Sequence, residues 1–314
     1  MATSEAAPAR ADQTALGVGL ILASVVTMAF ADAVVKRVSA DLTIWQIFTA
    51  RSLSAVILLV VLLRALSIPM LPRRPGWVVI RSVLLVLAWI TFYASLPVIP
   101  LSAAAAAAYT GPIMIALLSA ALLKEPVTPL QWAGVLIGFL GVAAIVRPGT
   151  DAFSWFTILP LLCAAFYALA MVLTRSKCRD EAPLALGLAL HVCFVATGII
   201  ATVLLAALGL ASETKAAFPF LLGDWMPMGL KEWGVMALLG VLSAAYFAGV
   251  ARAYQIAPPQ IIATFDYAYL ISAAIWGYVF FSETPGPLTI GGMILISLAG
   301  WLVATHSSRR AKPA

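Results

Sequence analysis

Long apolar segments alternate with short polar or proline-containing segments along most of the chain. Because a helix rises 1.5 Å per residue, about 20 apolar residues match a hydrocarbon core roughly 30 Å thick. The pattern therefore predicts an all-α integral membrane protein with ten transmembrane helices. The first five are Thr14–Lys36, Ile44–Leu63, Gly76–Leu96, Leu101–Leu123 and Leu130–Val146. The second five are Ser154–Thr174, Leu184–Leu208, Glu232–Tyr254, Gln260–Phe281 and Gly286–Thr305.

Composition supports a membrane protein and excludes a soluble globule. The 314 residues are 63% hydrophobic and only 10% charged, whereas a soluble domain carries about 25% charged residues. The net charge of +6 does not require a nucleic acid, because the basic residues lie mainly in short loops between apolar segments. Such a distribution sets the orientation of a protein in the bilayer.

The segment that begins at Pro97 is repeated near the C-terminus at an offset of 158 positions. Identical residues align without a gap in pairs that include Pro100/Pro258, Ala105/Ala263, Tyr109/Tyr267, Ala116/Ala274, Glu125/Glu283, Pro129/Pro287, Leu130/Leu288 and Gly134/Gly292. A weaker match at offset 138 aligns Arg37 with Arg175, and the loop 211–231 absorbs the difference of 20 residues. Each half holds five spans, so the halves must insert in opposite orientations. We expect two inverted five-helix repeats around a central cavity.

Domain organisation and orientation follow from this count. We expect cytoplasmic tails at 1–13 and 306–314, and repeats at 14–147 and 148–305. Eleven Lys and Arg residues fall on the side of the termini, five on the other side, and three within spans, which accounts for all 19. The bias predicts that both termini are cytoplasmic, so Lys124 and Glu283 should lie on opposite sides. The loop 211–231 either follows the outer membrane surface or is an ordinary solvated loop.

The chain resembles the EamA-type, ten-helix members of the drug/metabolite transporter superfamily. The motifs that carry the resemblance are LLKEP at Leu122–Pro126, FFSETP at Phe280–Pro285, and the glycine-bearing helices Trp132–Ile145 and Ile290–Gly300. The resemblance implies a basket of helices in which spans 1, 3, 4, 6, 8 and 9 surround the cavity and spans 5 and 10 are peripheral. It also implies similarity to YddG-like amino-acid exporters and to carriers for S-adenosylmethionine or riboflavin.

Charged residues inside the spans are candidates for function, because a charge at bilayer depth is costly. Asp32 and Arg51 lie at similar depth on neighbouring spans, so they form an ion pair, or Asp32 bonds Lys36 one turn later. Asp266 and Arg252 form a second candidate pair. Asp32, Asp266 or both either titrate during transport, hold a substrate amine, or serve structure alone. The candidates for coupling or gating are Asp32, Arg51, Arg252 and Asp266.

Other polar residues have structural interpretations. Arg81 lies close enough to a span end for its side chain to reach the membrane surface. His191 is expected to be packed inside the bundle. Glu125 and Glu283 end their spans and are expected to cap turns or bond nearby backbone, with a role in alternating access as the alternative.

Aromatic residues gather on the spans assigned to the cavity. Trp89 and Tyr93 are four residues apart and share a helix face, and Tyr109 and Tyr267 are repeat mates. A tyrosine hydroxyl needs a partner, which favours a protein-lined or hydrated position over lipid; helix packing is the alternative for each ring. We expect the substrate pathway to be lined by Trp89, Tyr93, Tyr109, Tyr167, Ser243, Tyr246, Asp266 and Tyr267.

The fourth span combines a run of small residues, Ala103–Ala108, with the pair Gly111 and Pro112. Small side chains let helices approach closely. Proline removes one backbone hydrogen bond, so we expect a kink at Pro112.

The sequence shows no catalytic constellation, nucleotide-binding glycine loop or metal-ligand cluster, so we expect neither an enzyme nor a cofactor. We expect a secondary transporter of the bacterial inner membrane that moves a small organic metabolite by alternating access. An exporter of amino acids or related zwitterions is the leading interpretation, with protons as a candidate coupling ion. The alternatives are uptake of S-adenosylmethionine, riboflavin or another nucleotide-like metabolite, and, from a different class, a channel or membrane receptor. The oligomeric state is open between monomer and homodimer.

Overall fold

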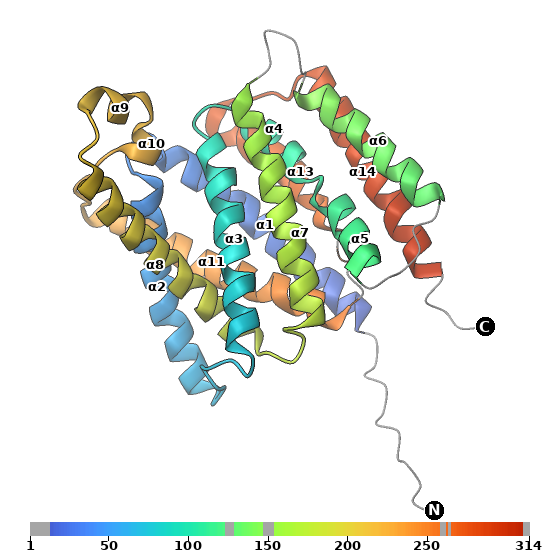
Figure 1. The fold of residues 1–314 in the computed structure, drawn as a ribbon, viewed down its shortest axis with the longest axis horizontal. Coiled ribbons are helices and arrows are strands. Elements are labelled where there is room, and N and C mark those ends of the chain that lie inside the picture. Colours follow the sequence, from blue (N-terminus) through green and yellow to red (C-terminus); the bar gives the residue numbers. More distant parts are fainter. Residues whose placement is uncertain (1–12, 123–128, 147–153, 258–261, 263–264, 310–314) are drawn as a thin grey trace, which may run out of the picture.

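The computed structural model describes residues 13–122, 129–146, 154–257, 262 and 265–309, and these are almost entirely helical (Figure 1). The helices of the first half are α1 (Thr14–Val38), α2 (Ile44–Ala65), α3 (Pro75–Ser95), α4 (Leu101–Ala108), α5 (Gly111–Leu122) and α6 (Pro129–Val146). Those that follow are η1 (Trp155–Thr157), α7 (Ile158–Ser176), α8 (Pro183–Leu208), α9 (Ser212–Ala217), α10 (Pro219–Leu222), α11 (Leu230–Ile256), α13 (Ala268–Phe281) and α14 (Pro287–Arg309). Each of the ten predicted spans overlaps at least one of these helices.

Six helical segments in the described part of the chain are long and apolar enough to cross a membrane: α1, α2, α3, η1 with α7, α8 and α11. Large apolar side chains cover the outside of the bundle, such as Ile57, Val203 and Trp301. The charged side chains of Arg51 and Asp32, by contrast, are almost completely buried inside the bundle. This distribution suits a protein surrounded by hydrocarbon, where polar groups must be satisfied within the bundle.

The segment predicted as the fourth span breaks rather than bends. It is divided into α4 and α5, with Tyr109 and Thr110 in a turn between them. Gly111 and Pro112 open α5, and proline suits the first turn of a helix because the backbone N–H it lacks has no partner there. The predicted kink is therefore a helix break. The described residues of the segment predicted as the ninth span show the same feature: Phe265 and Asp266 are helical, Tyr267 is a turn, and α13 follows.

The bundle is held by close pairing of helices that are distant in sequence. The most extensive contacts join α6 with α14, α2 with α8, α3 with α7, and α1 with α11. Figure 1 shows α6 and α14 side by side at one edge of the bundle. A Cβ atom added at Gly141 would lie 2.9 Å from the backbone oxygen of Gly292 and 2.8 Å from Ile296. Glycine therefore permits the close approach of these two helices.

The loop 211–231 is largely exposed but is attached to a neighbouring helix. It contains the short helices α9 and α10 and is attached to the start of α2. The Trp45 indole N–H donates to the carbonyl of Leu221 at 2.7 Å. The Gln46 amide both donates to the Met226 carbonyl and accepts from the Met226 N–H.

Candidate substrate cavity

A small cavity lies among α1, α3, the α4–α5 break, α7 and the start of the α13 region. Its volume, measured as the space open to the centre of a water molecule, is about 50 Å³. Its lining residues are Met28, Asp32, Trp89, Phe92, Ala108, Tyr109, Gly111, Cys163, Tyr167, Asp266 and Tyr269. This volume holds a few water molecules. A metabolite would require the helices around the cavity to move apart.

Asp32 is the centre of a hydrogen-bonded cluster that joins four helices. The Tyr93 hydroxyl on α3 donates to Oδ1 of Asp32 at 2.8 Å, and the Tyr269 hydroxyl on α13 donates to Oδ2 at 2.7 Å. Arg51 on α2 donates through Nη1 to the Tyr93 oxygen at 2.9 Å. The predicted neighbours Asp32 and Arg51 are thus linked through a tyrosine hydroxyl. Asp32 does not use Lys36, which bonds Glu283 instead.

Arg51 is fully buried, and aromatic rings surround its guanidinium group. The Cζ atom lies 5.5 Å from the ring centre of Phe48, 5.6 Å from that of Tyr93 and 5.1 Å from that of Phe194. Within the described residues, its Nε and Nη2 atoms have no hydrogen-bond partner. Cation–π attraction, which strengthens when the cation is desolvated, therefore supplies part of the stabilisation of this charge.

Asp266 is the second carboxylate of the cavity and precedes the turn at Tyr267. It is 1% exposed, and its Oδ2 accepts a hydrogen bond of 2.9 Å from the Tyr254 hydroxyl on α11. The proposed partner Arg252, on the same helix as Tyr254, is exposed instead. The cavity therefore holds two carboxylates, and Tyr254 takes the position expected for Arg252 beside Asp266.

The aromatic residues and Ser243, all predicted for the pathway, divide into those that lie at the cavity and those that lie outside its lining. Trp89, Tyr109 and Tyr167 line the cavity. Tyr267 lies beside it, with its ring centre 6.2 Å from that of Tyr109. The other members are Tyr93, which contacts Asp32, and Tyr246 and Ser243, which are buried on α11 outside the cavity lining.

The EamA-like transporter family matches residues 15–147. Residues 15–147 are therefore an EamA-family domain, and this type of domain belongs to the drug/metabolite transporter superfamily.

Curated relatives of the transporter are similar over most of their length. A pseudopaline exporter of Pseudomonas aeruginosa is 28% identical over 285 residues, which cover 90% of this chain and 94% of that protein. A riboflavin transporter of Rhizobium johnstonii is 29% identical over 237 residues (75% and 72%). An S-adenosylmethionine uptake transporter of Rickettsia prowazekii is 21% identical over 281 residues (89% and 89%). One crystal structure shares the fold with a TM-score of 0.65 at 20% identity, over 96% of this chain and 100% of its own.

Sequence reasoning missed several residues of the transporter's cavity. Tyr269 stacks on Tyr109, with ring centres 4.8 Å apart and an angle of 15° between the rings. It lies two positions after Tyr267, so on an unbroken helix the two would point in different directions. The turn at Tyr267 places both rings near Tyr109. No sequence signal pointed to Tyr269, because the residue aligned with it at the offset of 158 is Gly111, which carries no ring.

Other polar residues of the EamA transporter have structural partners. The side chain of Arg81 does not reach the membrane surface: it is 1% exposed and donates through Nε to the Thr174 hydroxyl at 2.6 Å. His191 is packed as expected, with Nδ1 3.1 Å from the Ser52 hydroxyl. Lys124 and Glu125 lie outside the described residues. Those that are described contain no cluster of His, Cys, Asp and Glu suited to a metal ion.

Proposed function

We propose that this transporter is a secondary carrier that exports amino acids or related zwitterions across the bacterial inner membrane by alternating access. The observation that carries the proposal is the presence of two buried carboxylates, Asp32 and Asp266, in one aromatic-lined cavity. Carboxylates attract an ammonium group, and aromatic faces add a cation–π contribution. A substrate with a positively charged amine therefore fits this lining better than an anion does.

The carboxylate end of a zwitterion needs hydrogen-bond donors. Arg252 is exposed and does not supply them. The indole Nε1 of Trp89 and the hydroxyl of Tyr267 are buried donors without a partner among the described residues. Because unpaired buried donors are costly, we infer that they bond the substrate when it enters.

We also propose that residues 14–147 and 148–305 form inverted five-helix repeats with ten membrane crossings. The packing supports this arrangement: α2 with α8 and α6 with α14 each pair a helix with its repeat mate. In the proposed repeat the mate of α1 is α7 and the mate of α11 is α3. Just as α1 packs on α11, α7 packs on α3. Tyr109 and Tyr267 are repeat mates at matching turns, and interrupted helices near the midplane are a common setting for transporter sites.

Sidedness labelling tests the topology. Leu71, between α2 and α3, and Leu230, at the start of α11, are 87% and 93% exposed. The variants Leu71→Cys and Leu230→Cys, made without the native cysteines, should react with an impermeant thiol reagent from opposite sides. The Lys and Arg bias predicts that residue 71 is cytoplasmic. Labelling of both from one side would contradict the inverted repeat.

Reconstitution into proteoliposomes tests the substrate class. A panel of labelled amino acids should give saturable uptake and counterflow, and Asp266→Asn should reduce both while the protein remains folded. The pseudopaline exporter supports export of a small organic molecule, because it aligns over 94% of its length. Saturable uptake of riboflavin or S-adenosylmethionine, with none of any amino acid, would overturn the proposal. Flux without counterflow would indicate a channel.

A further inference from the structure

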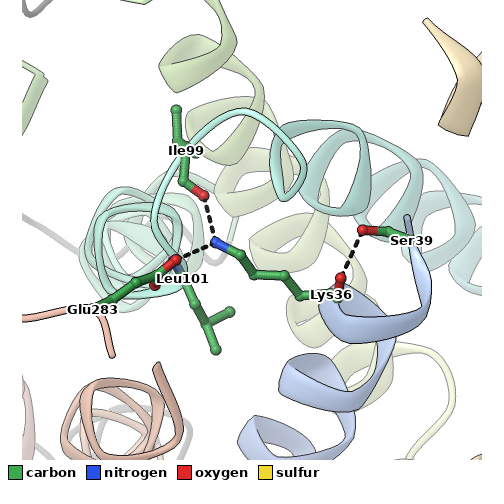
Figure 2. Close-up of polar contacts among 5 residues, drawn as sticks. All are labelled: Lys36, Ser39, Ile99, Leu101 and Glu283. Atoms are coloured by element: carbon green, nitrogen blue, oxygen red, sulfur yellow. Dashed lines mark hydrogen bonds and ion pairs between the residues drawn. The ribbon is translucent and has the colours of Figure 1, made fainter. Parts of the chain in front are cut away.

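Figure 2 shows a second charged cluster, which lies at the C-terminal ends of α1 and α13. Its two charged residues, Lys36 and Glu283, are not among those that line the cavity. Lys36, in the last turn of α1, places Nζ 2.7 Å from Oε1 of Glu283, which follows α13. The same Nζ donates to the carbonyl of Ile99 at 2.9 Å, and the N–H of Leu101 donates to Oε2 of Glu283 at 3.0 Å. Three segments distant in sequence therefore meet at one ion pair.

This cluster differs from an ordinary surface salt bridge. The side chains of Lys36 and Glu283 are only 12% and 20% exposed. Leu101 is the first residue of α4, and its N-cap, Pro100, provides no side-chain cap. Glu283 supplies that cap from the other half of the chain, and a carboxylate at a helix N-terminus also interacts favourably with the helix dipole. One charge therefore stabilises both the end of α1 and the start of α4.

The segments joined by this ion pair also form the walls of the cavity. Asp32 lies one helical turn before Lys36 on α1. Ala108 and Tyr109 lie at the far end of α4, and Tyr269 lies on α13. A path from the cavity to this end of the bundle could open where α1 separates from α4 and α13. That separation would break the cluster, because the cluster joins these segments.

We propose that Lys36 and Glu283 form a latch that closes the cavity toward this side of the membrane, which the charge bias predicts to be the outer side. The proposal rests on the proposed function, in which the cavity holds the substrate. Release requires Glu283 to leave both Lys36 and the N-terminus of α4. Closure restores all three hydrogen bonds together, which gives the transporter a defined closed state on this side.

A native cysteine provides a reporter that does not depend on the substrate. Cys163 lines the cavity and is 8% exposed. Cys193 is partly exposed, and Cys178 lies between α7 and α8, where burial raises the pKa of its thiol and slows alkylation. The parent for the experiment is the C178A/C193A variant, in which only Cys163 can react.

The test measures how fast an impermeant maleimide labels Cys163 when added to each side of the membrane. Lys36→Met should raise the rate about tenfold from the Lys36 side alone, which corresponds to about 1.4 kcal/mol. Glu283→Gln should also raise the labelling rate, because it removes the negative charge that holds Lys36. Glutamine keeps the size of the side chain and one acceptor oxygen, so the variant tests the charge alone. Lys36→Arg keeps the positive charge, so it should show the same labelling rate as the parent. The matched control is Lys215→Met, which breaks an exposed ion pair with Asp224 and should change nothing.

Parental labelling rates in both Lys36→Met and Glu283→Gln, with Cys163 reactive after denaturation, would overturn the latch. An equal rise in Lys215→Met, or a rise from both sides, would also overturn it, because either result indicates general loosening. Glu283→Gln serves as the test if Lys36→Met fails to fold. Failure of the substrate assay would leave these labelling results intact, so the two proposals can be judged separately.

Discussion

The hydroxyl groups of Tyr93 and Tyr269 allow a quantitative test of how much their hydrogen bonds to Asp32 stabilise the protein. Tyr269→Phe removes one donor, the hydrogen bond of 2.7 Å to Oδ2. Tyr93→Phe removes the bond of 2.8 Å to Oδ1 and also the acceptor of Arg51. The guanidinium of Arg51 would then have no hydrogen-bond partner among the described residues. We therefore expect Tyr93→Phe to be the more destabilising change.

The magnitudes follow from the type of bond. Interhelical hydrogen bonds in membrane proteins average about 0.6 kcal/mol with a maximum near 1.7, whereas bonds to charged groups in proteins contribute about 1.5–3 kcal/mol. The acceptor at Asp32 is an acidic group, so Tyr269→Phe should lower the free energy of unfolding by about 1–2 kcal/mol. Tyr93→Phe breaks two bonds and should lower it by about 2–3 kcal/mol.

Unfolding in mixed micelles by titration with denaturing detergent measures these differences. Tyr278→Phe is the matched control, because Tyr278 lies on the same helix as Tyr269 and is 61% exposed. The double variant Tyr93→Phe/Tyr269→Phe should cost less than the sum of its parts if both hydroxyls act on one carboxylate. An effect of Tyr93→Phe no larger than that of Tyr278→Phe would refute the assignment of Asp32 as the centre of the cluster.

The remaining predictions concern transport and packing. If Asp32 or Asp266 exchanges protons during transport, Asp32→Asn or Asp266→Asn will flatten the dependence of initial rate on pH, because an amide does not titrate there. Asp224→Asn, on an exposed loop, should leave that profile unchanged, and unchanged profiles in both cavity variants would contradict proton coupling at these residues. Gly141→Leu should lower the free energy of unfolding by more than 2 kcal/mol, since its Cβ would lie 2.9 Å from backbone on α14. Gly291→Leu has open space around its Cβ and should be nearly neutral in the same detergent titration.

The charged residues within the apolar segments were identified from the sequence, but their hydrogen-bond partners were not. Asp32, Arg51 and Asp266 were identified from sequence because a charge within an apolar span is rare. Their partners were not: a carboxylate at a given depth can face any of several neighbouring helices. Tyr93, Tyr269 and Tyr254 were selected by the rotation and packing of α3, α13 and α11, which no local pattern encodes. The burial of Arg81 was missed for the same reason, because only packing against α7 supplies the Thr174 hydroxyl.

The sequence alone determined where the helices form, because about 20 consecutive apolar residues satisfy the bilayer whatever they pack against. It also indicated a distortion near Pro112, predicted as a kink and found as a helix break, and it indicated the repeat through spaced identities such as Tyr109 and Tyr267. Only the tertiary structure decided that Asp32 and Asp266 share one cavity and that Glu283 caps a helix from the other half of the chain. These contacts join residues more than 180 positions apart, so they depend on how helices face one another rather than on their own composition.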